Sequence, residues 1–420
     1  MSFALGTFFA WMLAVGAAWT LRNRFFAIFV AVLTGLEGLV ASAYEPFVGV
    51  AWPLFVACHV TVLVQVLSLT RPALRPLWFR VLVSWPAYYF LAAMLLGFFW
   101  LPLLLWWSPP LALPQQLVLG VPFVLAAIGM WQSLVGRESQ VRVSLMDAQQ
   151  SSGETLARHR SPSLPNRAES DAGQEGAPAA ASAAARPLRV VQITDPHLGP
   201  FMSVPRLRRI AERAVAREPD LVLLTGDFLT MESQAREDYL ADALAPLAAL
   251  EGRVFACLGN HDHEALHIVK NALARAKVRL LVDESALVET PAGPVQIVGA
   301  DFHFRDRAAH LTRLAGAHPR VTGALRLWLL HDPGAFRRIP VGEADLVLSG
   351  HTHGGQVGLL SLGGSWTPVW SIAKIPDHGL FARGPDRLYI HRGTGHYGFP
   401  LRLGVPSEQS LLEVHFAPGG

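Results

Sequence analysis

The chain has 420 residues, of which 51% are hydrophobic and 16% charged, and its formal net charge is +3. Residues 1–136 carry only seven charged side chains, five arginines and two glutamates, and the mixed charge of a soluble protein begins at Arg137. This distribution excludes a uniformly soluble protein and predicts a membrane part followed by a soluble part. No block of Lys or Arg forms a basic stripe, so we expect no nucleic acid partner.

Five apolar runs in the first part are long enough to cross a bilayer, which takes about 20 residues of helix. They cover residues 3–21, 25–43, 47–69, 81–106 and 114–135. The first run also has the small residues of a signal-peptide cleavage site at 16–18, but it lacks a positive n-region and another apolar run follows it. We therefore expect a retained first helix and a transmembrane domain of about five helices over 1–136.

The arginines between these runs predict the orientation of the helices. They occur in alternate connections, at Arg22 and Arg24, at Arg71, Arg75 and Arg80, and after the fifth run at Arg137 and Arg142. Loops rich in Lys and Arg stay in the cytoplasm. We therefore expect a multi-pass protein of the cell inner (cytoplasmic) membrane, with its N-terminus outside and its C-terminal domain in the cytoplasm.

Two ionisable residues, Glu37 and His59, fall inside the predicted spans. A charge at that depth is costly, which makes both residues functional candidates. The alternative is that they pair with each other or lie near an interface, and the sequence leaves both interpretations open.

Residues 137–187 are rich in Ala, Ser, Gly and Pro, a composition that cannot bury enough apolar surface to offset chain entropy. We expect a flexible linker that tethers the C-terminal domain and lets it reach the lipid headgroups. Within it, residues 140–145 alternate well enough for a short strand.

After the linker, apolar runs alternate with helical patterns, and polar residues follow the runs. The helical patterns cover 203–217, 235–250 and 264–276. The apolar runs are followed by Asp195-Pro196-His197, Gly226-Asp227, Gly259-Asn260-His261-Asp262, His331-Asp332 and Gly350-His351-Thr352-His353. Open α/β sheets build their sites just beyond the carboxyl ends of strands, so we expect an α/β domain over 188–420 with these side chains gathered at one edge.

In these five motifs and their order, residues 188–416 resemble the calcineurin-like metallophosphoesterase superfamily. Gly354-Gly355-Gln356 after the last histidine, together with 392–395 and 400–402, resembles a bacterial branch with membrane-associated phosphodiesterases and a lipid A pathway pyrophosphohydrolase. The resemblance implies a four-layer α/β/β/α sandwich. Pro196 stands where Leu is commoner in the family, which concerns the shape of the substrate pocket more than metal binding.

The residue types suit a pair of divalent cations, which can activate a water molecule and neutralise phosphoryl charge when they lie about 3.5–4 Å apart. Such a pair needs a shared carboxylate, and Asp227 is the candidate. Asp195, His197 and His353 would complete one set of ligands, and Asn260, His331 and His351 the other. Mixed oxygen and nitrogen donors favour Mn²⁺, Fe or Zn²⁺ over Mg²⁺.

We expect a membrane-anchored, dinuclear-metal phosphoric ester hydrolase. His261, oriented by Asp262, would protonate the leaving oxygen or stabilise the transition state. The expected substrate is a phosphodiester, pyrophosphate or phosphomonoester on a lipid-linked molecule in the bilayer, and the sequence does not indicate an oligomeric state. The alternatives are a nuclease or cyclic-nucleotide phosphodiesterase, and a membrane sensor or scaffold whose metal domain does not catalyse.

The remaining histidines of the domain lack motif spacing, and we expect surface or packing roles for most of them. Two are candidates for substrate contact, namely His303 and His396.

Overall fold

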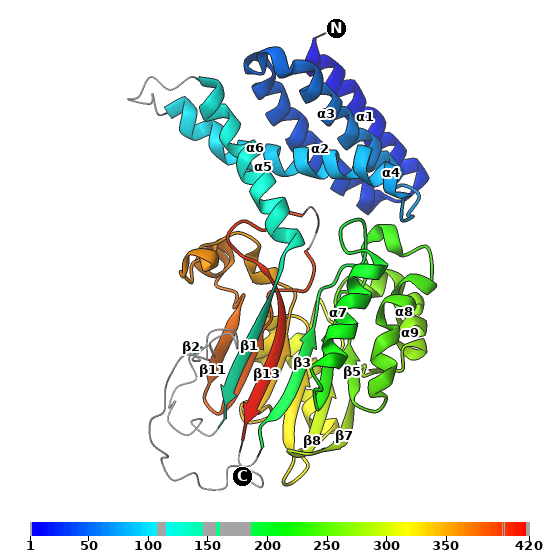
Figure 1. Cartoon of the computed structure of the whole chain (residues 1–420), viewed down its shortest axis with the longest axis vertical. Coiled ribbons are helices and arrows are strands. Elements are labelled where there is room, and N and C mark those ends of the chain that lie inside the picture. Colours follow the sequence, from blue (N-terminus) through cyan, green and yellow to red (C-terminus); the bar gives the residue numbers. More distant parts are fainter. Residues whose placement is uncertain are drawn as a thin grey trace.

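The computed structural model describes residues 2–106, 115–145, 157–159, 186–396, 398 and 400–416. A helical bundle formed by the N-terminal part stands on one end of a two-sheet α/β domain (Figure 1). The helices of the bundle are α1 (Phe3–Leu21), α2 (Arg24–Tyr44), α3 (Trp52–Ser68), α5 (Trp85–Trp106) and α6 (Gln115–Leu134). The short α4 (Leu77–Phe79) and a π-helical turn over Arg80–Ser84 lead into α5.

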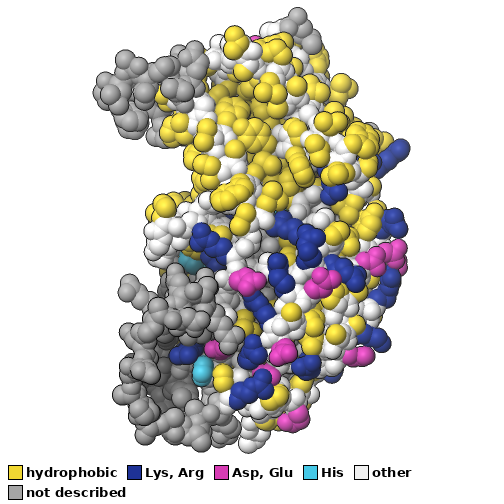
Figure 2. Space-filling model, in the orientation of Figure 1, with side chains coloured by type: hydrophobic (Ala, Val, Ile, Leu, Met, Phe, Trp, Pro, Cys, Tyr) yellow, Lys and Arg dark blue, Asp and Glu magenta, His cyan; other side chains and the backbone are white. Residues whose placement is uncertain are grey.

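Four segments of the described chain are long and apolar enough to cross a membrane, namely Phe3–Leu21, Arg24–Phe47, Gly49–Ser68 and Leu77–Pro102. The fifth predicted span corresponds to α6, whose apolar helical stretch, Val118–Leu134, is shorter. Large apolar side chains point outward from the bundle, for example Leu13 and Leu39, each 73% exposed. Hydrophobic side chains cover the bundle in Figure 2, whereas charged side chains gather over the α/β domain. Such an apolar outer surface suits contact with lipid.

Glu37 and His59 pair inside the bundle. His59 Nδ1 lies 2.7 Å from Oε1 of Glu37, and its Nε2 lies 3.2 Å from the hydroxyl of Thr7. All three side chains are buried. The expectation that the two ionisable residues pair with each other is confirmed, and the pair links α1, α2 and α3.

The α/β domain contains two sheets. The order of the first is β1 (Gly136–Ser144), β13 (Ser407–His415), β3 (Leu188–Ile193), β4 (Leu221–Thr225), β5 (Val254–Cys257) and β6 (Arg279–Leu280). The order of the second is β2 (Ala157–His159), β11 (Gly379–Arg383), β12 (Asp386–Ile390), β10 (Leu346–Ser349), β9 (Leu325–Leu329), β8 (Gly293–Gly299) and β7 (Glu284–Thr290). Strands β3, β4 and β5 are parallel, as are β8, β9 and β10.

The two sheets pack face to face, and helices cover their outer faces. Buried side chains of both sheets form the central core, among them Leu221 and Phe255 from the first sheet and Leu327 and Leu346 from the second. The first sheet is covered by α7 (Val204–Ala216), α8 (Asp238–Leu244) and α9 (Leu266–Arg275), and the second by α10 (Arg307–Ala317). The α/β/β/α arrangement implied by the resemblance is confirmed.

The predicted linker boundary needs correction. Strand β1 begins at Gly136, directly after α6, and pairs in parallel with β13 over nine residues. Val143 of β1 is buried in the core between the sheets. The predicted start of the domain at 188 is therefore wrong, because residues 136–144 belong to its first sheet, as the alternation over 140–145 suggested. Most of the remaining predicted linker, 146–156 and 160–185, lies outside the described residues.

The α/β domain also contacts the bundle directly, against the expectation of a loose tether. In the first contact, Arg206 of α7 donates hydrogen bonds to the carbonyls of Ser133 and Leu134 at the end of α6, at 3.3 and 3.0 Å. In the second, the amide of Gly404 donates to the Gln132 side chain at 2.7 Å. The bundle and the domain therefore share an interface next to the end of α6.

Candidate metal centre

The predicted ligands lie at the carboxyl ends of five strands that face one another across the two sheets. Asp195 follows β3, Asp227 follows β4 and Asn260 follows β5 in the first sheet, while His331 follows β9 and the His351–His353 turn follows β10 in the second. Parallel neighbours end at the same edge of a sheet, so this topology brings side chains from distant parts of the chain together.

Five of the predicted ligands have a left-handed backbone. They are Asp195 (φ 49°), His197 (φ 44°), Asp227 (φ 58°), His351 (φ 68°) and His353 (φ 52°). A non-glycine residue in this region is uncommon and costs about 1–3 kcal/mol where sterics are unfavourable, and such residues cluster at functional sites. These left-handed turns lie at the strand ends, where the side chains of the two groups gather.

Two glycines let the ligand loops approach one another closely. A Cβ atom at Gly350 would lie 2.1 Å from a carboxylate oxygen of Asp195, and one at Gly259 would lie 2.2 Å from Oδ1 of Asp227. Any side chain at either position would displace a predicted ligand. This explains the glycine that begins the third motif and the one that begins the fifth.

The ligating atoms form two adjacent groups, Asp195 with His197 and His353, and Asp227 with His331 and His351. Oδ2 of Asp227 lies 3.2 Å from Nε2 of His331 in its own group and 3.8 Å from Nε2 of His197 in the other. In the first group, Nε2 of His353 lies 3.3 Å from Oδ1 of Asp195. The position of Asp227 between the two groups is the one that a bridging carboxylate requires.

The electrostatics of the cluster fit bound cations. Burial opposes ionisation of Asp195 and Asp227, yet neighbouring histidines, His353 for Asp195 and His331 for Asp227, keep the pKa of each carboxyl well below its usual range. Burial would also lower the pKa of His331, but Asp227 and Asp195 raise it to about 10. The positive charge on protonated His331 faces the carboxylates of Asp227 and Asp195, and a bound metal ion would supply positive charge at the same point.

Hydrogen bonds orient His331 and leave Asn260 suited to ligation. Nδ1 of His331 lies 2.6 Å from the carbonyl of Thr225, so this nitrogen carries the proton that it donates and Nε2 faces Asp227. Oδ1 of Asn260 is buried and has no hydrogen-bond partner among the described residues. A buried amide oxygen in this state is suited to a cation. The donors present therefore fit the two predicted sets.

The predicted partner of His261 is wrong. Nδ1 of His261 lies 2.9 Å from Oε1 of Glu264, and the His261 amide donates to Oδ1 of Asp227. The buried carboxylate of Asp262 instead accepts the backbone N–H groups of Asp227, Phe228 and Gly259, each at 2.8 Å. Asp262 thus holds the loop of Asp227 and the loop of Gly259 together, and Glu264 orients His261.

Two residues near the centre were missed from the sequence. Arg402 is buried, its guanidinium lies 3.2 Å from Nδ1 of His353, and it donates to the carbonyls of His353 and Gly395. Burial lowers the pKa of this guanidinium to about 9. The ring of Phe302 lies 6.3 Å from that of His331 and 6.1 Å from that of His351. Arg402 therefore supports one metal group, and Phe302 forms a wall beside the other.

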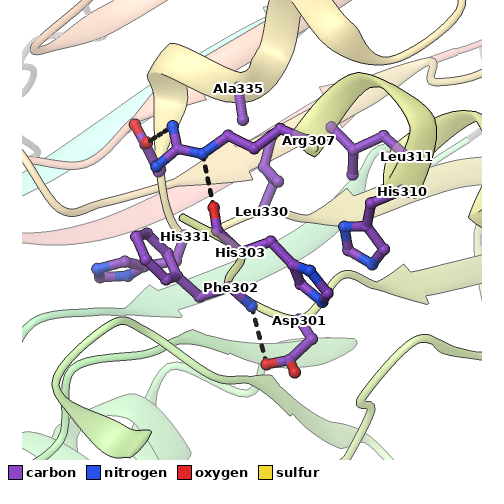
Figure 3. A pocket seen from close by; sticks show the side chains of 10 residues that line it. Asp301, Phe302, His303, Arg307, His310, Leu311, Leu330, His331 and Ala335 are labelled. Carbon is purple, nitrogen blue, oxygen red and sulfur yellow. Dashed lines mark hydrogen bonds and ion pairs between the residues drawn. The ribbon is translucent and has the colours of Figure 1, made fainter. Parts of the chain in front are cut away.

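The two histidines proposed for substrate contact differ in position. His396 lines the same cavity as His197 and His261. His303 instead lines a small pocket of about 20 Å³, where its ring stacks on that of His310 at 3.9 Å (Figure 3). Asp283, His303 and His310 form a third group of Asp and His side chains that lie close together. Within it, Nε2 of His310 lies 2.8 and 2.9 Å from the two carboxylate oxygens of Asp283, so this ion pair explains why the side chains lie close together.

Three other histidines pair with carboxylates, as expected for surface or packing roles. His263 pairs with Asp301, His267 with Glu237 and His378 with Asp377. His391 is buried, and its Nδ1 accepts a hydrogen bond from the amide of Gly393.

Comparisons with known proteins show what the second part of the chain is similar to. Residues 188–355 match the calcineurin-like phosphoesterase family. The phosphodiesterase YaeI of Escherichia coli is 28% identical over 235 residues, which cover 55% of this chain and 83% of that protein. A transmembrane protein with metallophosphoesterase domain from Danio rerio is 30% identical over 238 residues, and the match covers 53% of this chain and 52% of the fish protein. Among solved structures, the NAD nucleotidase of Haemophilus influenzae matches 40% of this chain and 38% of its own, at 19% identity and a TM-score of 0.30.

Proposed function

From a calcineurin-like metallophosphoesterase domain with a His/Asp metal site, joined to apolar helices, we propose that this chain is a membrane-anchored, two-metal phosphoric ester hydrolase. The proposed substrate is a phosphodiester, pyrophosphate or phosphomonoester on a lipid-linked molecule. Mn²⁺, Fe or Zn²⁺ would suit the mixed donors.

The position of Asp227 carries this proposal. Its Oδ2 lies within 3.8 Å of ligating nitrogens from both groups, His197 on one side and His331 on the other. Asp195, His197 and His353 would hold one ion and Asn260, His331 and His351 the second. Two cations, when bound, lower the pKa of water and neutralise charge on the reacting phosphoryl group.

His261 is the proposed acid of the reaction. Its ring lies 5.7 Å from that of His197 and lines the cavity that opens on the centre. Burial would lower the pKa of His261, but Glu264 and Asp227 raise it above its usual value, which favours the protonated ring. This protonated ring would donate to the leaving oxygen or stabilise the transition state. Asp262 would act only through the loops that it holds.

We further propose that the α/β domain lies on the cytoplasmic side of the inner membrane. The connections nearest the domain are the basic ones. Arg80 donates to the carbonyl of Pro200 in the domain at 3.4 Å, and Arg22 donates to the carbonyl of Leu69 at the end of α3 at 2.7 Å. Retention of such loops in the cytoplasm supports this side for the domain as well.

The direct test is turnover of bis(p-nitrophenyl) phosphate by the purified full chain with added Mn²⁺. We expect hydrolysis that EDTA abolishes and Mn²⁺ restores. Two bound ions without any turnover of diester, monoester or pyrophosphate would favour the sensor or scaffold alternative. Cleavage of DNA or cyclic nucleotides in preference to lipid-linked esters would favour the nuclease or cyclic-nucleotide phosphodiesterase alternative.

A further inference from the structure

A cavity of about 260 Å³ lies between the helical bundle and the metal centre. Its bundle side is lined by α2, α3 and α5, and its apolar residues there are Phe29, Leu33, Val66, Leu69 and Leu91. Its domain side includes Phe201, Leu229 and Met231, and it reaches His197, His261 and His396. We call this cavity the tail chamber. One space thus has a hydrocarbon wall from the membrane helices and two residues of the proposed reaction site.

We propose that the tail chamber binds the hydrocarbon chain of the substrate while its phosphoester lies at the metal centre. This inference rests on the proposed function and deepens it. The substrate class is an amphiphile whose apolar chain begins close to the reacting phosphoryl group, such as a lipid phosphodiester or a lipid-linked pyrophosphate.

The depth of the chamber within the bundle supports this occupant. Arg24 begins α2, and basic residues at a helix end lie at the level of the lipid headgroups. With a rise of 1.5 Å per residue, Phe29 and Leu33 lie about 8 and 14 Å further along α2, in the region of the acyl chains. In a lipid, the phosphate lies at headgroup level and the hydrocarbon chain lies deeper in the bilayer. The metal centre and the tail chamber follow one another in the same order.

The outer surface of α2 supports access from the bilayer. Phe29 lines the chamber and is 43% exposed. Its neighbours Phe25 and Val32 are 70% and 67% exposed. The wall of the chamber therefore continues into surface that contacts lipid, so a chain can enter without passing through water.

A polar network fixes the side of the chamber formed by α3 and α5. Ser84 donates to Oε1 of Gln65 at 2.8 Å, Gln65 Nε2 donates to the hydroxyl of Tyr88 at 3.3 Å, and Tyr88 donates to Glu232 at 2.7 Å. Gln65, Tyr88 and Glu232 all line the chamber. Because these groups satisfy one another, they shape the wall without needing water or a polar ligand.

The test compares variants of the full chain in lipid nanodiscs on p-nitrophenyl alkyl phosphates with methyl, octyl and dodecyl chains. Leu33→Trp fills the chamber, and Val32→Trp, at the next position but on the lipid-facing surface, is the matched control. Longer chains also partition into the bilayer, so the quantity compared is the ratio of kcat/KM of variant to wild type for each ester. Partitioning cancels in this ratio.

For Leu33→Trp we expect a ratio near one on the methyl ester and a fall of at least tenfold on the octyl and dodecyl esters. Burial of one methylene is worth about fourfold in binding, so losing a few contacts suffices. Val32→Trp should keep a ratio near one on all three esters. Leu33→Ala, which enlarges the chamber, should raise kcat/KM for dodecyl relative to octyl.

The outcomes separate the two proposals. A Leu33→Trp ratio that is the same for all three esters, whether near one or low, would overturn the tail chamber, since the space would then be either irrelevant or filled by a structural lipid. Thermal melting and metal analysis check that each variant is folded and metal-loaded. No turnover of any ester by the metal-loaded wild type would instead overturn the hydrolase.

Discussion

The phenol of Tyr88 in α5 donates a 2.7 Å hydrogen bond to Oε1 of Glu232, in the segment that follows Asp227. The ring of Tyr88 also contacts that of Phe201, at 5.4 Å, in the segment after Asp195 and His197. Helix α5 is thus joined to the loop that carries Asp195 and His197 and to the loop that carries Asp227.

Tyr88→Phe should loosen the segment around Glu232. A hydrogen bond to a charged group is worth about 1.5–3 kcal/mol, so we expect roughly tenfold or faster hydrogen exchange there. Metal content should not change, because Tyr88 is not a ligand. Exchange mass spectrometry and metal analysis measure the two effects. Tyr89→Phe is the control, since the Tyr89 hydroxyl donates to the Phe123 carbonyl within the bundle. Equal exchange in both variants would contradict this coupling.

Asp227→Asn should abolish hydrolysis and lower the metal content. The substitution removes the carboxylate that lies between the two ligand groups, so two cations would face each other without a shared negative charge. Activity assays and elemental analysis of the purified full chain test this. Full activity in this variant would refute the two-metal assignment.

His261→Ala should keep the bound metals and lower the rate by about 10²–10⁴, the usual contribution of a positioned acid or base. His263→Ala is the matched control, because His263 is two positions away and pairs with Asp301. Loss of metal from the His261 variant would show that this residue is a ligand instead.

Glu264→Gln tests the orientation of His261. Burial lowers the pKa of His261, and removal of the Glu264 charge would leave that effect less opposed. If the protonated ring is the proposed acid, the fall in rate at high pH should begin at a lower pH in the variant. A pH–rate profile with an unchanged alkaline limb would exclude this role.

A reporter fused after Gly420 should be active only in its cytoplasmic form. The prediction depends on seven arginines in alternate connections, Arg22, Arg24, Arg71, Arg75, Arg80, Arg137 and Arg142. Paired alkaline phosphatase and fluorescent-protein fusions measure it. A phosphatase signal from outside the cell would reverse the orientation and with it the lipid leaflet available to the enzyme.

Glu408→Gln should destabilise the domain at neutral pH by about 3 kcal/mol or more, since one partner of a buried pair is lost. Burial opposes ionisation of Glu408, but Arg392 holds the pKa of this carboxyl well below its usual range through hydrogen bonds to Oε2 from its side chain and amide, each at 3.1 Å. Because the pKa of Glu408 is lower in the folded state than in the unfolded state, its ionised form stabilises the folded domain. This stabilisation is full at pH values above the unfolded pKa of about 4.3, and it is lost as the pH falls below that value.

The difference in stability between Glu408→Gln and wild type should therefore be greatest at pH 7 and should shrink below about pH 4. Thermal melting of the detergent-solubilised chain across this range measures it. Glu413→Gln lies on the same strand at a half-buried position and serves as control. A difference that does not depend on pH would show that packing and not charge is responsible.

The sequence was sufficient to predict that the candidate metal ligands lie together, because each follows an apolar strand and parallel strands end at a common edge. The roles of the residues next to these candidate ligands could not be predicted as well from the sequence. Asp262 is adjacent to His261, which suggested a pair, but its carboxylate is needed by three amides of converging loops. That need arises from the approach of Gly259 to Asp227, which depends on the packing of β4 against β5.

Long-range pairing explains the other corrections. Strand β1 pairs with β13, which lies more than 250 residues later in the chain. The alternation of residues 140–145 alone was therefore too weak a signal to assign this segment to the domain, given the polar composition around it. Arg402 likewise acts on His353 through folding of the C-terminal segment over the centre. The branch signature at 400–402 was the only sequence signal at this position.

Only Val135 separates the last residue of α6 from the first residue of β1. With so short a junction, the proposed metal centre would be held at one distance from the bilayer and in one orientation toward it. The enzyme would then work on molecules that diffuse laterally in its own membrane, and neighbouring vesicles would be out of reach. Its rate should accordingly follow the mole fraction of substrate in that membrane and should not change when vesicles are diluted in buffer.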